Sequence, residues 1–177
     1  MFINLQSRRA AFTLVELMVA TGLTALVAIA IGMLAYYSSR SFVAMANYTD
    51  LAKFNQLALD KMSRDIRQSG GLTAYATNSI TLLDVSTNSL RFTYDPTAQT
   101  LVRVSGGTTN QYLTNCTSFQ FFLYQHTVLS NTFDCYVPAA VTNARVVQMI
   151  WTCARQIKGV NATTANSESA QIALRNH

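Results

Sequence analysis

The chain has 177 residues, of which 50% are hydrophobic and 12% are charged, and its formal net charge is +5. This length suits one modest domain together with one anchoring segment. The basic residues are dispersed along the chain, without a cluster or a stripe, so the mild positive balance does not indicate a nucleic-acid-binding protein.

The chain opens with a short basic leader that is followed by a long apolar segment. Arg8 and Arg9 precede Leu17–Tyr37, a run of 21 residues without any charge. At about 1.5 Å per residue, a helix of this length spans about 31 Å, close to the thickness of a bilayer core. Two arginines before the run and Arg40 after it place the N-terminus on the cytoplasmic side.

One carboxylate, that of Glu16, lies at the mouth of the apolar segment. Placing an acid at membrane depth costs about 2.5–3.5 kcal/mol on insertion scales, so a partner that offsets this cost is expected. On the residue alone, the alternative is that Glu16 extends to the headgroups from its place near a helix end.

The ten residues around this acid carry a resemblance to a known family. Ala11-Phe12-Thr13-Leu14-Val15-Glu16-Leu17-Met18-Val19-Ala20 resembles the class III prepilin motif of type IV pilins and type II secretion pseudopilins. The resemblance implies cleavage between Ala11 and Phe12 by a membrane-embedded aspartyl peptidase, which also methylates the new amine of Phe12. Ala11 stands where the family usually has glycine, and Glu16 occupies the characteristic fifth mature position.

Charge pairing gives this acid a physical role that agrees with the resemblance. In a staggered bundle, Glu16 of one subunit can meet the positive amine on Phe12 of its neighbour. Such a pair is stronger in a low dielectric than in water, and leaving either partner buried alone is costly. We therefore expect Glu16 to set the axial register during assembly.

The segment after the apolar run is predicted to continue the helix, because it has no Pro or Gly between Leu34 and Gln68. Apolar residues recur at three- and four-residue steps, as on a helix that packs one face on a sheet; they are Leu51, Phe54, Ala58, Met62 and Ile66. Gly70-Gly71 is the predicted stop. The expected parts are a leader peptide (1–11), a transmembrane and assembly helix (12–37), an amphipathic second half of the helix (38–69) and a periplasmic β-sheet domain (70–177).

After Gly71 the sequence shows the pattern of antiparallel strands. The predicted strands are Ser79–Asp84, Asn88–Asp95, Gln99–Ser105, Thr117–Gln125, Arg145–Ile157 and Ser169–Asn176. Turn signals are Asp95-Pro96-Thr97 and Ser105-Gly106-Gly107-Thr108, and polar loops are expected at Ser130–Val141 and Lys158–Ser167. The predicted fold class is α+β, and the resemblance implies the pilin fold, a long N-terminal helix packed on an antiparallel sheet.

Three segments of the second half resemble the larger minor subunits of the family, the J-type pseudopilins and PilW-type minor pilins. They are Asp65-Ile66-Arg67-Gln68-Ser69-Gly70, Leu113-Thr114-Asn115-Cys116-Thr117-Ser118-Phe119-Gln120-Phe121 and Ala170-Gln171-Ile172-Ala173-Leu174-Arg175-Asn176. The resemblance implies a structural minor subunit of a type IV pilus or type II secretion pseudopilus, anchored in the bacterial inner membrane with a periplasmic C-terminal domain. The implied partners are other pilin or pseudopilin subunits, the prepilin peptidase/methyltransferase and the membrane, and no nucleic acid is expected.

Three cysteines lie in the expected periplasmic region, where disulfides form. If Thr117–Gln125 and Arg145–Ile157 are antiparallel neighbours, Cys116 falls near Cys153, which favours that pair. Pairing of either residue with Cys135 stays open, because cross-strand bridges are geometrically demanding.

No sequence pattern indicates an enzyme, a metal site or a cofactor, so a non-enzymatic protein is expected. The two glycine pairs are isolated turns rather than phosphate-binding loops, and His and Cys lack metal-site spacing. A calcium site formed by scattered loop acids stays open; these are Asp84, Asp95 and Asp134.

Two interpretations from other classes remain. One is a secreted or membrane-anchored periplasmic binding protein whose apolar run is an ordinary signal or anchor, with Ala28-Ile29-Ala30 as a cleavage-like site. The other is a membrane-anchored enzyme, in which a thiol such as that of Cys135 would need His126 or His177 as its base.

Overall fold

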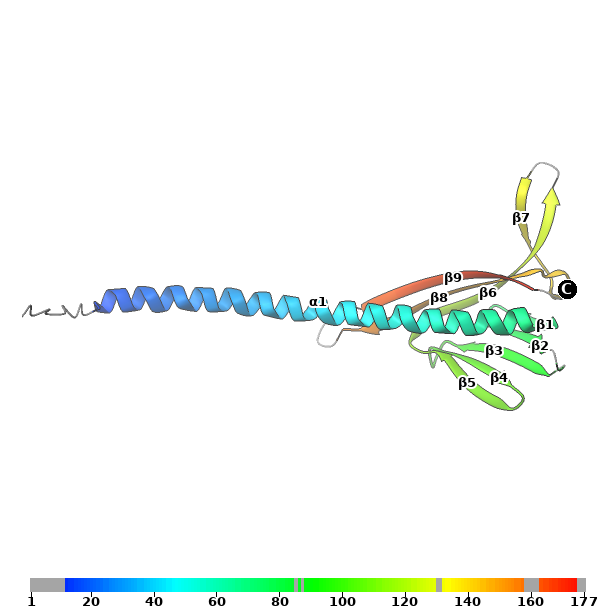
Figure 1. Ribbon diagram of the computed structural model, residues 1–177, viewed down its shortest axis with the longest axis horizontal. Helices are drawn as coiled ribbons and strands as arrows, with labels where there is room; N and C mark the ends of the chain where they lie inside the picture. The colour runs from blue at the N-terminus through cyan, green and yellow to red at the C-terminus, as the bar shows by residue number, and fades with distance from the viewer. Residues whose placement is uncertain (1–11, 85, 87, 130–131, 158–162, 175–177) are drawn as a thin grey trace, which may run out of the picture. The chain divides into compact units, whose positions relative to one another are not determined.

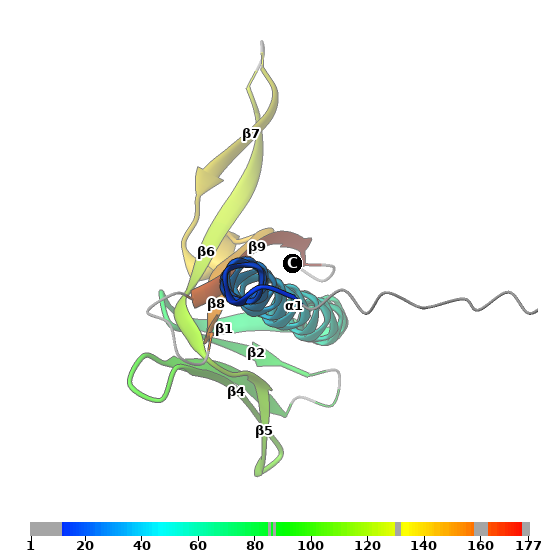
Figure 2. The ribbon, with the colours of Figure 1, turned by 90° about the vertical axis from the view of Figure 1, so that its left-hand side faces the viewer.

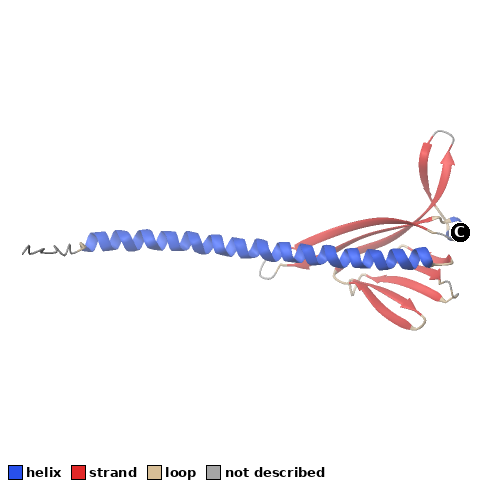
Figure 3. Ribbon diagram, viewed as in Figure 1, coloured by secondary structure: helices blue, strands red, loops and turns tan. Residues whose placement is uncertain are grey.

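The structure, a computed structural model, describes residues 12–84, 86, 88–129, 132–157 and 163–174. Within these residues, one helix, α1 (Leu14–Gln68), precedes nine strands and a short 3-10 helix, η1 (Val141–Asn143) (Figures 1 and 3). The strands are β1 (Gly71–Ala76), β2 (Ser79–Leu83), β3 (Ser89–Asp95), β4 (Thr100–Ser105), β5 (Thr108–Leu113), β6 (Cys116–Leu129), β7 (Thr132–Pro138), β8 (Val146–Gln156) and β9 (Thr163–Ala173). The fold class is α+β, as predicted.

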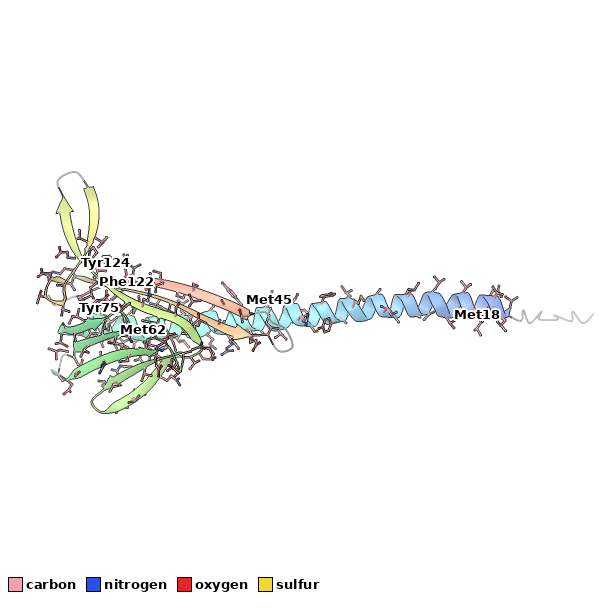
Figure 4. All side chains as sticks on the ribbon, turned by 180° about the vertical axis from the view of Figure 1, so that it is seen from behind. Met18, Met45, Met62, Tyr75, Phe122 and Tyr124 are labelled. Carbon is pink, nitrogen blue, oxygen red and sulfur yellow. A yellow bond between two sulfur atoms is a disulfide. The ribbon has the colours of Figure 1, made fainter. Side chains whose placement is uncertain are left out.

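The chain divides into two compact units, residues 1–43 and 44–177. In the described part of the first unit, α1 exposes large apolar side chains on every side, Met18 among them (Figure 4). A helix that is hydrophobic all round belongs in a membrane or in the interior of an assembly. Among the described residues, α1 is the one helix long and apolar enough to cross a membrane, which is consistent with a single-pass membrane protein.

The second unit contains two antiparallel sheets. One has five strands in the order β1-β2-β3-β4-β5, and the other has four in the order β7-β6-β8-β9. The five-stranded sheet is a meander of hairpins. The four-stranded sheet has β6 and β8 at its centre, with β7 and β9 as its outer strands (Figure 2).

The residues of α1 in the second unit share one hydrophobic core with both sheets. The buried side of the helix carries Leu51, Asn55, Ala58, Met62 and Ile66, and Met62 lies among the strands (Figure 4). The predicted stripe was wrong at Phe54, whose side chain is 52% exposed. Asn55 takes the inward position instead, because its side chain accepts a hydrogen bond from the buried Trp151.

Most predicted strands are confirmed, and the alternation of apolar residues correctly predicted which side chains of β3 and β6 face the core. In β3 the buried residues are Leu90, Phe92 and Tyr94, and in β6 they include Phe119, Phe121 and Leu123. Both turn signals are also confirmed. Asp95 Oδ1 accepts a hydrogen bond from Thr97 N at 2.8 Å, and Gly106 and Gly107 have φ values of 56° and 79°. Two successive positive φ angles are what a two-residue hairpin turn requires.

Three strands were not predicted, because they lack a clear apolar alternation. β1 and β5 are outer strands whose residues are mostly exposed. β7 occupies much of the polar segment predicted as the loop Ser130–Val141, which was wrong for Thr132–Pro138. The predicted loop Lys158–Ser167 was wrong from Thr163 onward, where β9 already pairs with β8. In β1 and β5, backbone pairing rather than side-chain burial holds the segment as a strand.

Candidate assembly site

Glu16 closes a reciprocal cap at the start of α1. Thr13 N donates to Glu16 Oε2 at 2.9 Å, and Thr13 Oγ1 donates to the same oxygen at 3.1 Å. In return, Glu16 N donates to Thr13 Oγ1 at 3.2 Å. This arrangement is a capping box, in which a threonine before the helix and a glutamate three residues later satisfy each other's backbone amides.

The cap gives Glu16 a partner within its own chain. The sequence analysis did not find this role, although the spacing Thr-x-x-Glu before an apolar run is its signature. Both bonds from Thr13 end on Oε2, so the second carboxylate oxygen makes no hydrogen bond within the described residues. A carboxylate has about four lone-pair sites, so one group can serve a cap and a second donor together.

The predicted cleavage site lies at the edge of the described residues. Ala11 is outside them, whereas Phe12 is described and its side chain is 86% exposed. Phe12 and Thr13 precede the first helical residue, Leu14. In this unit, an exposed aromatic residue and a capped acid therefore lie together at the beginning of a predominantly apolar helix.

In the second unit, the structure joins Cys116 to Cys153 by a disulfide, 37 residues apart in sequence. The two cysteines are directly opposed in the ladder between β6 and β8, the register from which this pair was favoured. Both are buried, at 0% and 1% exposure. The side chain of Cys135, which enters both alternative pairs, lies outside the described residues, as does that of His126.

A buried polar contact fixes how the helix of the second unit sits on the four-stranded sheet. Trp151 Nε1 donates to Asn55 Oδ1 at 3.2 Å, and both side chains are fully buried. The indole ring also stacks on Phe119 with a centroid distance of 5.7 Å. An unmet buried donor costs about 1–3 kcal/mol, so the bond favours the helix position at which the indole finds its acceptor, although Asn55 Nδ2 is itself buried without a hydrogen-bond partner among the described residues.

A second polar contact ties the same helix to the five-stranded sheet. Arg103 Nε and the hydroxyl of Tyr112 both donate to Asp65 Oδ2, at 2.7 and 3.0 Å. Burial, followed by the hydrogen bond and the charge of Asp65, raises the pKa of Tyr112 to about 12. The helix is thus bound to each sheet by a buried or half-buried polar contact besides apolar packing.

The remaining candidates do not converge on a site within the described residues. No three His, Cys, Asp or Glu side chains lie close enough together there to hold a metal ion. The carboxylate of Asp95 accepts the backbone hydrogen bond of its turn from Thr97 N. The side chain of Asp134 and all of His177 lie outside the described residues. A cavity of about 200 Å³ lies between the helix and the strands, lined in part by Leu51, Asn55 and Leu113, and contains no paired acid–base groups.

Comparisons of the chain with protein-family models, with curated proteins and with solved structures find no match. The case for a function therefore depends on the chemistry of the chain itself.

Proposed function

We propose that the protein is a structural minor subunit of a type IV pilus or a type II secretion pseudopilus. In this proposal, prepilin peptidase cuts between Ala11 and Phe12 and methylates the new amine. The observation that carries it is Glu16, an acid at the mouth of an apolar helix. The protein is anchored in the bacterial inner membrane by that helix, carries its sheet domain in the periplasm and performs no catalysis.

The capping box makes the proposed assembly chemistry more specific. Thr13 holds one oxygen of Glu16, so the carboxylate enters a bundle of helices already oriented. The free oxygen then accepts the charged amine of Phe12 from a neighbouring subunit. A preoriented acceptor loses less conformational entropy when the pair forms, and the surrounding apolar side chains strengthen the pair by excluding water.

Three substitutions separate the cap from the charge pair. Glu16→Gln keeps a side-chain oxygen that accepts from Thr13, since glutamine also serves in capping boxes, but it removes the charge. Glu16→Ala removes both functions. Thr13→Val removes the hydroxyl and leaves the charge of Glu16 in place.

We expect the peptidase to cleave Glu16→Gln and Glu16→Ala normally. The amount of each variant in the sheared filament fraction should fall at least about tenfold, because the amine of Phe12 in the neighbouring subunit is then a buried charge without a partner, which costs several kcal/mol. Thr13→Val should stay near the wild-type level, since a helix cap contributes only about 1 kcal/mol. The assay is quantitative blotting of membrane and filament fractions from cells that supply the peptidase and the assembly machine. If Glu16→Gln assembles as well as the wild type, Glu16 is only a cap and the proposed role is wrong.

A further inference from the structure

Among the described residues, β9 is an outer strand of the four-stranded sheet and pairs with β8 alone (Figure 2). It is 11 residues long, and its register with β8 continues without a bulge from Thr163 to Ala173. A strand in this position presents a row of backbone amides and carbonyls that the sheet itself does not use.

The direction of these backbone groups follows from one hydrogen bond. Leu174 N donates to Arg145 O at 2.8 Å, which places the backbone of Leu174 toward β8. Because hydrogen-bonded and non-bonded pairs alternate in an antiparallel ladder, even-numbered residues of β9 bond to β8. The amides and carbonyls of odd-numbered residues, including Ser169 and Gln171, therefore face the open edge.

β9 lacks the features by which native proteins protect an outer strand. Such edges usually carry lysine, proline or a bulge, or they are short. β9 has no lysine, no proline and no bulge, and its one charged residue is Glu168. Its outward positions carry small or neutral polar side chains, such as Ala165, Ser167 and Ser169, and these are exposed. Glu168 is therefore the one residue of β9 that opposes the addition of another strand, and it does so only for a strand that carries an acid beside it.

A groove of about 710 Å³ runs between this edge and the helix of the second unit. Its wall on the strand side consists of Ala170, Gln171 and Ile172, and the helix contributes Arg64 and Arg67 with one acid, Asp60. Two arginines against one aspartate leave the groove with a net positive charge. The sequence analysis regarded the basic residues as dispersed, because the helical spacing of Arg64 and Arg67 becomes a single wall only after folding.

We propose that the β9 edge and this groove bind an extended, acidic segment of a partner protein, which adds to the sheet as a further strand. The outward amides and carbonyls of β9 supply the backbone hydrogen bonds, as in other complexes formed by strand addition. Alternate side chains of the added strand point into the groove, where carboxylates meet Arg64 and Arg67. The acids belong beside Ala170 and Ile172, because Glu168 repels a like charge further along the strand. This site is independent of the proposed filament function, since it lies wholly within the second unit.

The test uses the full-length protein in detergent micelles and a fluorescent ten-residue threonine peptide that carries glutamate at two alternate positions near one end, so that both acids can lie beside Ala170 and Ile172 and away from Glu168. Binding is followed by fluorescence anisotropy, with a threonine–lysine peptide as the charge control. We expect the glutamate peptide to bind at least about tenfold more tightly than the lysine peptide, because charge complementarity sets the preference.

Two matched pairs of variants locate the binding. Ser169→Pro removes one outward amide while sparing the bonds to β8, since proline is tolerated where the missing amide faces solvent. It should weaken binding of the glutamate peptide by about tenfold, and Ser169→Ala should not, because strand addition depends on the backbone. Arg67→Gln should weaken binding several-fold, whereas Arg91→Gln, on β3 and not part of the groove, should leave it unchanged.

Hydrogen exchange on the wild-type protein provides a readout that does not depend on how the variants fold. The peptide should slow exchange at the amides of Ser169 and Gln171 and leave those of β5, at the edge of the other sheet, unchanged. Unchanged exchange in β9, equal binding of the two peptides, or full binding by Ser169→Pro would each overturn the proposal. Protection of β9 that rises with protein concentration, without peptide, would also overturn it, because two copies would then be pairing with each other.

Discussion

Removing the disulfide between Cys116 and Cys153 gives a quantitative test of how the second unit is held together. The bridge closes a loop with a sequence separation of 37. In the chain-entropy model, a closed loop of this size lowers the entropy of the unfolded state enough to stabilise the fold by about 4 kcal/mol at 25 °C. The double substitution of both cysteines by alanine should cost about that amount. It removes two fully buried side chains, which adds a smaller packing loss.

The assay is urea unfolding of the full-length protein in detergent, followed by tryptophan fluorescence. Trp151 is the one tryptophan of the chain, it is fully buried, and it lies in β8 two residues before Cys153. Its emission therefore reports the unfolding of the second unit. With a urea slope of about 2 kcal/mol per molar, the midpoint should fall by about 2 M.

Cys135→Ser is the matched control and should leave the midpoint close to that of the wild type, because it keeps the bridge between Cys116 and Cys153. A large loss of stability in Cys135→Ser, with little loss in the double alanine variant, would refute the reasoning. It would mean that Cys135 takes part in the bridge in solution.

Two further predictions concern the contact between the helix and the five-stranded sheet. Asp65→Ala should lower the free energy of unfolding in urea by about 2 kcal/mol, because it leaves Arg103 and Tyr112 without their charged acceptor. Asp50→Ala should lower it by less than about 1 kcal/mol, because the pair of Asp50 with Arg155 is exposed. Equal losses in the two variants would contradict this ranking. The pKa of Tyr112 is raised to about 12 from 10.0, so its contribution to stability is complete below pH 10 and is lost as the pH rises toward 12. Ultraviolet titration of the phenolate checks this, and an Asp65→Asn variant whose Tyr112 still titrates near 12 would show that the carboxylate is not a cause.

The elements that could be predicted from the sequence are those in which apolar, core-facing residues recur with the period of a helix or a strand. α1 was predicted within two residues of its observed bounds, because it has no internal breaker in its second half and ends before Gly70. β3 and β6 were found because their apolar residues alternate. β5 has no such pattern, since an outer strand of mostly exposed polar residues is held by backbone bonds, which any sequence without proline can form. β7 was missed because its apolar residues do not alternate regularly with polar ones.

The candidate site shows the same division between local and nonlocal information. The cap of Glu16 by Thr13 is local, and its spacing was present in the sequence. The hydrogen bond from Trp151 to Asn55 joins residues 96 positions apart. It made an asparagine, rather than the apolar Phe54, the inward residue of the helix. No periodicity argument can find such a replacement, because it depends on which strand lies opposite.

The central claim is that this chain follows the prepilin pathway, and the most direct test is the intact mass and N-terminal sequence of the protein from a membrane fraction. We expect a chain that starts at Phe12 and carries one added methyl group. A chain that starts at Met1 would contradict processing, and a soluble chain that starts near Ile31 would show that the apolar run is an ordinary signal segment.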